Sequence, residues 1–130
     1  MQRFLGRYSE PIYCVMRFVL GLAFAQHGMQ KVLGLLGGQK QPLASVPGVG
    51  GVIELVAGLM IAVGLLTAWA AFISSGEMAV AYFMVHAKGG FWPVVNHGEL
   101  AVVYCFVFLY MATRSSGRYS LDAAIRGGKP

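Results

Sequence analysis

The chain has 130 residues, of which 57% are hydrophobic and only 12% carry a full charge. A typical soluble domain has about 25% charged residues. The composition therefore excludes a disordered chain and argues against a soluble globular domain, which needs polar side chains to cover its surface. The net charge of +5 comes from basic residues at the chain ends and in loops, with no polar stripe. That placement indicates membrane topology and no nucleic-acid partner.

The first apolar run, residues 11–32, predicts a membrane span with Ser9 as its N-cap and Pro11 in its first turn. Its start resembles a secretory signal with an Ala-x-Ala cleavage site at residues 23–25. Arg17 would then interrupt the apolar region of that signal, so we expect a retained span.

Residues 49–85 form one apolar run that would be about 55 Å long as a helix, against a hydrocarbon core about 30 Å thick. The run must fold back, and residues 64–68 are the expected hairpin. This gives spans at residues 48–66 and 68–85. A fourth span at residues 97–113 follows the helix breaker Gly-Gly-Phe-Trp-Pro.

The loop at residues 34–47 is rich in Gly and Pro, and the polar tail contains a short helix at residues 121–126 that Ser120 caps. The fold class is therefore all-α: an integral membrane four-helix bundle forming a single domain over residues 1–130. The 18 glycines are about twice the number that average usage would give, and small residues let membrane helices approach closely.

Four spans place both chain ends on one side of the membrane. The end segments carry six basic residues, and the loops on the other side carry three. They are Arg3, Arg7, Arg114, Arg118, Arg126 and Lys129 at the ends, and Lys31, Lys40 and Lys88 in the loops. The positive-inside rule then predicts that both termini are cytoplasmic.

Ionisable residues inside spans are costly, at about 2.5–3.5 kcal/mol each at the membrane centre, and should meet partners in the bundle interior. Helix rise sorts those of this chain into two layers. The outer layer holds His27, Lys31, Glu54, His86, His97 and Glu99. The inner layer holds Arg17 and Glu77, which we expect to form an ion pair. Gly51, Glu54 and Gly58 share a helix face, which places Glu54 on a stripe of small residues.

Several of these residues also have structural interpretations. Glu99 fits a capping box with Asn96, Lys31 fits a side chain that snorkels to the interface, and His86 and His97 fit interfacial positions. Glu54 has no such role, so it is the strongest functional candidate.

A site with acids, imidazoles and a cation at membrane depth can exchange protons with a lipophilic redox molecule such as a quinone. His27 and His86 would donate hydrogen bonds, and Glu54 or Glu99 would relay protons. A haem b held by two histidines is a lesser alternative. Cys14 and Cys105 lie 91 positions apart without a metal-ligand or haem-attachment motif, so we expect unpaired thiols, no covalent cofactor and no metal site.

The order and spacing of several short segments resemble the DoxX family of small four-helix membrane proteins. The segments are residues 17–31, 54–58, 64–67, 77–86, 98–99 and 117–122. The resemblance implies a multi-pass protein of the bacterial inner membrane that is often linked to quinone-dependent or thiol-handling oxidoreductase complexes. It carries over Arg17, His27, Lys31, Glu54, Glu77, Glu99 and Asp122.

Three functions remain open at this point. The first is a redox-linked subunit that binds a quinone or similar lipophile, with its electron source on another chain. The second is a non-catalytic subunit that anchors or assembles a larger complex, including a homo-oligomer. The third is a transporter, which the small size and the lack of an inverted repeat disfavour. Whether turnover occurs on this chain stays open, and the lipid bilayer is the expected partner in every case.

Overall fold

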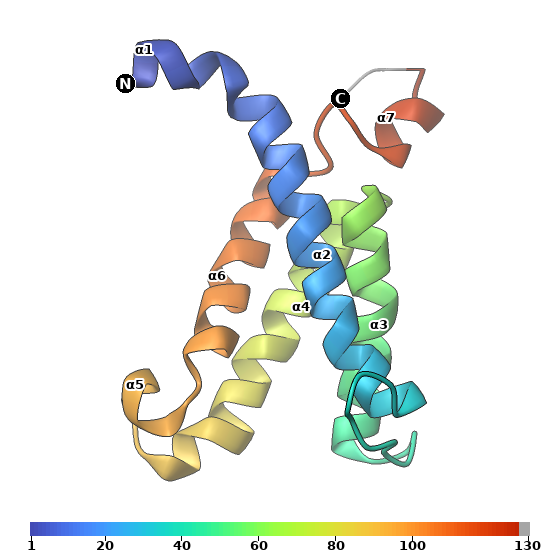
Figure 1. Ribbon diagram of the computed structural model, residues 1–130, viewed down its shortest axis with the longest axis vertical. Helices are drawn as coiled ribbons and strands as arrows, with labels where there is room; N and C mark the ends of the chain where they lie inside the picture. Colours follow the sequence, from blue (N-terminus) through green and yellow to red (C-terminus); the bar gives the residue numbers. More distant parts are fainter. Residues whose placement is uncertain (128–130) are drawn as a thin grey trace.

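The computed structural model describes residues 1–127, and all regular secondary structure in this part of the chain is helical, with no strand. Four longer helices lie side by side (Figure 1): α2 (Ser9–Leu33), α3 (Val46–Val63), α4 (Thr67–Ala81) and α6 (Glu99–Arg114). α2 packs along α3, and α4 packs along both α3 and α6. Lys129, one of the six terminal basic residues, lies outside the described residues.

Three stretches are long and apolar enough to cross a membrane: Gln2–Leu33, Val46–Val63 and Thr67–Gly89. The fourth long helix, α6, has 16 residues and so is about 24 Å long, less than the hydrocarbon thickness of about 30 Å. α6 nevertheless lies against α4 along the bundle, where the fourth span was predicted.

The start of α2 differs from the predicted capped end. α1 (Gln2–Leu5) and a 3-10 turn, η1 (Gly6–Tyr8), run directly into α2. The residue before α2 is Tyr8, and the amide of Ser9 already bonds to the carbonyl of Gly6. The predicted Ser9 cap is therefore wrong, because the chain is helical before Ser9 and this turn needs no side-chain acceptor.

The hairpin between α3 and α4 falls where the length argument placed it. Gly64 ends α3 with φ +74°, and its amide bonds to the carbonyl of Ile61 at 3.1 Å. Leu66 also has a positive φ, +47°, and Thr67 begins α4. The turn thus consists of the three residues 64–66, and the prediction of a hairpin in residues 64–68 is confirmed.

Beyond α4 the helix continues through a π-helical turn, η2 (Tyr82–His86), and a 3-10 turn, η3 (Ala87–Gly89). A short helix, α5 (Pro93–Asn96), then precedes α6. Both described chain ends lie at the same end of the bundle, and the segments on either side of α5 lie at the other (Figure 1). In the tail, Ser120 Oγ accepts a hydrogen bond from the Ala123 amide at 3.1 Å and caps α7 (Leu121–Ile125), which confirms the predicted cap.

Glycines set the close approach of α2 and α3. A Cβ atom at Gly21 would lie 2.7 Å from the Gly58 carbonyl oxygen, and one at Gly58 would lie 2.7 Å from the Ala25 amide. Gly28 meets the backbone of Gly51 and Leu55 in the same way. Backbone-to-backbone contact of this kind is the packing mode of membrane helices, and it confirms that the small-residue face of α3 is an interface.

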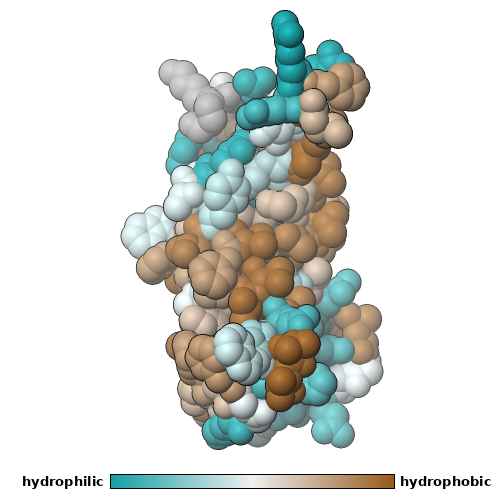
Figure 2. Space-filling model, turned by 90° about the vertical axis from the view of Figure 1, so that its left-hand side faces the viewer, coloured by the Kyte–Doolittle hydropathy of each residue, from teal (hydrophilic) through white to brown (hydrophobic). Residues whose placement is uncertain are grey.

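Large apolar side chains cover the outside of the bundle. Trp69, Phe83 and Phe106 are each at least 65% exposed. Figure 2 shows hydrophobic residues across the middle of one face, with hydrophilic residues gathered toward both ends. Such a surface is stable against lipid chains, and in water it would be an aggregation surface.

Candidate functional site

Two acids of the α3–α4 hairpin, the buried Glu54 and the half-buried Glu77, lie at the same height. Glu54 is ten residues before Gly64, and Glu77 is ten residues after Thr67, so each lies about 15 Å from the turn. Arg17, in contrast, lies at the turn itself, where its Nε donates to the Ile61 carbonyl at 3.0 Å. The predicted Arg17–Glu77 ion pair is therefore wrong.

The error came from the reference height assumed for each span. The prediction started the first and third spans at the same membrane edge, but α2 begins well beyond the hairpin, so Arg17 reaches only the level of Ile61. Glu77 consequently joins Glu54 near the middle of the bundle. The two acids form a central polar layer. This finding corrects the prediction that Glu54 lies in a layer near the outer face and Glu77 in a separate inner layer.

Lys31 and Glu54 form the central ion pair. The Lys31 Nζ atom lies 2.8 Å from Glu54 Oε1. The Glu54 side chain is 2% exposed, while that of Lys31 is 35% exposed. Glu54 faces α2 because Gly51 and Gly58, on the same face of α3, allow the helices to approach closely enough for the pair to form. A carboxylate buried this deeply needs such a cation, because loss of its hydration is costly.

One oxygen of each central acid has no partner within the described residues. Glu54 Oε2 and Glu77 Oε2 are both buried without a hydrogen bond. The Oγ atom of Ser74, one turn before Glu77 on α4, is also buried and unsatisfied. Native interiors leave few polar atoms in this state, so a cluster of them marks a place where a ligand, water or proton can be bound.

A cavity of about 320 Å³ adjoins the Lys31–Glu54 pair between α2, α4 and α6; we call it the inner cavity. Apolar side chains form most of its wall, and the polar ones converge from α2, α3, η2, α6 and the loop before α6. Its polar lining consists of His27, Lys31, Glu54, His86, His97 and Tyr104. The structure therefore brings four of the five predicted ligand or proton-relay candidates together, and it adds Tyr104.

Aromatic side chains hold Tyr104 at the cavity wall. Its ring stacks on Phe108 with centroids 5.3 Å apart, packs against Phe24 at 5.2 Å, and meets the edge of His27 at 6.3 Å. No side-chain hydrogen bond engages its hydroxyl within the described residues, although the residue is only 5% exposed. The phenol therefore has both a donor and an acceptor to offer a bound molecule.

Sequence reasoning missed Tyr104 because it searched for residues that are charged at membrane depth. A usable signal existed. Ala101, Tyr104, Phe108 and Met111 recur at intervals of three and four residues, and all four are buried on α6. This periodicity defines an inward-facing stripe, and a tyrosine on such a stripe is a candidate cavity residue.

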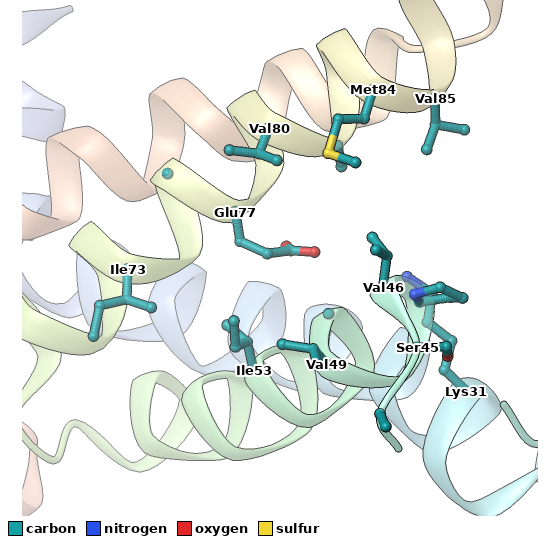
Figure 3. Close-up of a pocket in the computed structure, with 15 residues that line it drawn as sticks. Lys31, Ser45, Val46, Val49, Ile53, Ile73, Glu77, Val80, Met84 and Val85 are labelled. Carbon is teal, nitrogen blue, oxygen red and sulfur yellow. The ribbon is translucent and has the colours of Figure 1, made fainter. Parts of the chain in front are cut away.

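A second hollow, larger than the inner cavity, is formed by the two helices of the hairpin. This lateral cleft has a volume of about 580 Å³ and lies between α3 and α4 (Figure 3). Glu77 projects from α4 into it, opposite Val49 and Ile53 of α3. Lys31 lines both the lateral cleft and the inner cavity, so the central ion pair is part of the wall between the two.

Arg17 is bound entirely by backbone carbonyls. Besides Ile61, its guanidinium donates to Ala62, Ser116 and Tyr119, and the side chain is 3% exposed. Ile61 and Ala62 belong to the last turn of α3, where unsatisfied carbonyls favour a cation. Arg17 therefore fastens the tail and α2 to the end of α3.

Asp122 also binds the tail to the α3–α4 hairpin. One carboxylate oxygen accepts from the Leu66 amide at 3.1 Å, the other accepts from the Ser116 hydroxyl, and the Asp122 amide donates to the Gly64 carbonyl at 3.0 Å. Burial opposes ionisation of Asp122, but the hydrogen bonds from Ser116 and from the hairpin amides outweigh it and lower its pKa. We call Arg17, Ser116, Asp122 and the hairpin they bind the tail latch.

Glu99 does not reach the inner cavity. It is exposed, it begins α6, and it forms no capping box, because Gly98 takes the N-cap position. Asn96 is instead the buried last residue of α5: its amide donates to Gly90 at 2.8 Å and to Tyr82 at 3.1 Å, and its oxygen accepts from Gly98. His86 lies beside it, with Nδ1 3.4 Å from the Asn96 carbonyl.

Cys14 and Cys105 are both free, and no group of three His, Cys, Asp or Glu residues in residues 1–127 is close enough to hold a metal ion. The Sγ atom of Cys105 instead lies 3.5 Å from the Ser75 hydroxyl, which donates to the Cys105 carbonyl.

The apolar exterior, the helical arrangement and the polar centre define a multi-pass helical membrane protein. A family model described as DoxX matches residues 12–87, more than half of the sequence, and the chain belongs to this family. It is 38% identical over 125 residues to an uncharacterized protein of Haemophilus influenzae, covering 91% of this chain and 93% of that protein.

A second uncharacterized Haemophilus influenzae protein is 29% identical over 73 residues, which is 56% of this chain and 48% of that protein. No solved structure matches the chain.

Proposed function

We propose that this chain is a subunit of a redox-linked membrane complex and holds the headgroup of a quinone in the inner cavity. The observation that carries the proposal is the convergence of His27, Tyr104 and the Lys31–Glu54 pair on one apolar cavity. A volume of about 320 Å³ lies at the lower end of the range for small-molecule pockets, roughly 300–1,000 Å³, and suits one ring.

The residues fit such a headgroup chemically. Quinone carbonyl oxygens accept hydrogen bonds, and the Tyr104 hydroxyl and the His27 imidazole are donors without a side-chain partner in the described chain. Conversion of quinone to quinol consumes two electrons and two protons. Glu54, with one unpartnered oxygen and Lys31 beside it, supplies a group that takes up and passes on protons. The electrons come from a partner subunit.

The test is gentle extraction of the protein from native membranes, followed by mass spectrometry of the lipophilic fraction. We expect quinone to copurify and its ratio to protein to fall roughly tenfold in Glu54→Gln and in Tyr104→Phe, since each removes an interaction with a charged or donor group. Glu99→Gln is the matched control, because Glu99 is exposed outside the cavity. Equal quinone content in all variants, with the helical content preserved, would contradict the proposal.

A second candidate is a non-catalytic anchor or assembly subunit. The Lys31–Glu54 ion pair favours it, since this pair also stabilises the contact between α2 and α3. On this reading, Glu54→Gln lowers thermal stability and the yield of the partner complex, and quinone content follows the amount of folded protein. The ratio of quinone to folded protein therefore separates the two functions.

We also propose that the bundle lies in the bacterial inner membrane with four spans and both termini in the cytoplasm. The support is the excess of basic residues at the chain ends and the position of both described ends on one side of the bundle (Figure 1).

A further inference from the structure

The lateral cleft between α3 and α4 is separate from the inner cavity, and the proposed function does not use it. Its walls are almost entirely aliphatic, with Ile53, Ile73, Val80 and Met84 on its two sides (Figure 3). Two ionisable groups interrupt this surface, the Glu77 carboxylate and the Lys31 ammonium. The cleft therefore combines a lining suited to a hydrocarbon chain with a polar end of defined chemistry.

The polar end restricts the headgroup. Glu77 Oε1 lies at the cleft wall, 3.0 Å from the position that a Cβ atom on Gly50 would take, and it makes no hydrogen bond within residues 1–127, so it can accept from a donor. Lys31 has three N–H donors, and the hydrogen bond to Glu54 uses one of them, so it can still supply a donor to an acceptor. A hydroxyl group both donates and accepts, and it matches this pair.

Charged headgroups match the Glu77 and Lys31 side chains less well than a hydroxyl group does. A cationic amine would pair with Glu77 but has no acceptor to offer the remaining N–H groups of Lys31. An anionic phosphate or carboxylate would pair with Lys31 but meet Glu77 and the neighbouring Glu54 as like charges. In a medium of low dielectric constant such repulsion is strong. The polar end of the lateral cleft therefore disfavours ordinary phospholipids as specific occupants.

We propose that the lateral cleft is a binding site for a single-chain amphiphile with a neutral hydroxyl head, the head lying between Glu77 and Lys31 and the chain along α3 and α4. The two sites share Lys31, but Glu77 and Gly76 line only the lateral cleft, so variants at these two positions separate this site from quinone binding.

Photoaffinity labelling tests the site directly. The probe is hexadecanol that carries a diazirine in its chain, added to the purified full chain in detergent, with labelled residues located by mass spectrometry. Three comparison probes carry an amine head, a carboxylate head or no head. We expect saturable labelling of the cleft walls by the alcohol, at least tenfold stronger than by the other three. Equal labelling by the headless probe would show nonspecific lipid contact and overturn the proposal.

Gly76 provides a variant that blocks the cleft without disturbing the fold. It lines the cleft, and a Cβ atom there would meet no atom within 4 Å. Gly76→Leu should therefore fill the cleft and reduce labelling roughly tenfold. Val103→Phe adds similar bulk on the exposed face of α6, outside the cleft, and should leave labelling unchanged.

Glu77→Leu removes the acceptor and should abolish the preference for alcohol over the headless probe. Persistence of that preference in Glu77→Leu, or undiminished labelling in Gly76→Leu, would overturn the proposal. Quinone content, which reports on the inner cavity, should stay at the wild-type level in Gly76→Leu, so failure of one proposal does not imply failure of the other.

Discussion

Gly28 shows how a single hydrogen atom decides the packing of two helices. A Cβ at this position would press against the backbone of Gly51 and Leu55, which cannot move away as a flexible side chain would. We expect Gly28→Ala to destabilise the protein by about 1–3 kcal/mol, the usual cost of overpacking, measured by thermal unfolding in detergent.

Gly76→Ala is the control for this prediction, because the same change there meets open space and removes the helix-weakening effect of glycine. It should leave stability equal or slightly raised. A stability loss in Gly76→Ala as large as that in Gly28→Ala would show that close backbone approach is not the cause.

The hydrogen bonds of Arg17 to backbone carbonyls contribute more to stability than its positive charge does. Its guanidinium donates to four carbonyls from α3 and the tail, which a lysine, with a compact ammonium, cannot reproduce. We expect Arg17→Lys to lower stability by about 1–3 kcal/mol, because buried carbonyls lose their donors. If Arg17 acted only as a cation at the helix end, Arg17→Lys would instead unfold at the wild-type temperature.

The tail latch ties an element outside the membrane to the α3–α4 hairpin, and its strength depends on the charge of Asp122. Hydrogen bonds hold the pKa of Asp122 below its ordinary value of 3.8 despite burial. The contribution of Asp122 to stability is therefore complete above that ordinary pKa, and it is lost as the pH falls through the lower pKa of the folded state.

We expect proteolysis of the tail to accelerate as the pH falls below about 4, measured with an acid-active protease on the purified protein. Asp122→Asn should give faster cleavage at neutral pH and little further change on acidification. A tail cleaved at the same rate across this range in the wild type would argue that Asp122 does not hold the latch.

The positions of the helix ends could be predicted from the sequence where the length of an apolar run or the local residue types determine them. A run of 37 apolar residues had to fold back, and Gly64 lies where the turn occurs. The Ser120 cap was equally local. Relative heights were not local, because they depend on how far α2 extends past the hairpin. Arg17 and Glu77 were consequently paired wrongly, whereas Lys31 and Glu54 were correctly placed in one layer.

The candidate functional site, like the helix positions, could be predicted only in part. Five charged or imidazole residues of the inner cavity could be found from their cost in a membrane span, but the stripe of α6 that brings Tyr104 to the cavity has no charge to reveal it. Glu99 was included for its charge, yet the loop at Asn96–Gly98 turns α6 so that Glu99 faces outward. The hydrogen bonds of Asn96 to Tyr82, Gly90 and Gly98 set this loop geometry, and no helix periodicity reveals them.

At the scale of the whole molecule, the charge distribution and the fold make one prediction about orientation. The two described chain ends and the hairpin at Gly64 share one end of the bundle, and the loop that contains Lys40 lies at the other (Figure 1). The larger basic charge belongs to the chain ends, so these should stay in the cytoplasm.

Fusions to alkaline phosphatase, which is active only outside the cytoplasm, test this orientation. We expect an inactive enzyme when it follows the tail and an active one when it follows Lys40. Replacing Arg3 and Arg7 by Gln while adding lysines beside Lys40 should weaken or reverse this contrast, because the bias in Lys and Arg sets the orientation. An active fusion at the tail of the wild type would place both termini outside and would put the tail latch on the opposite side of the membrane.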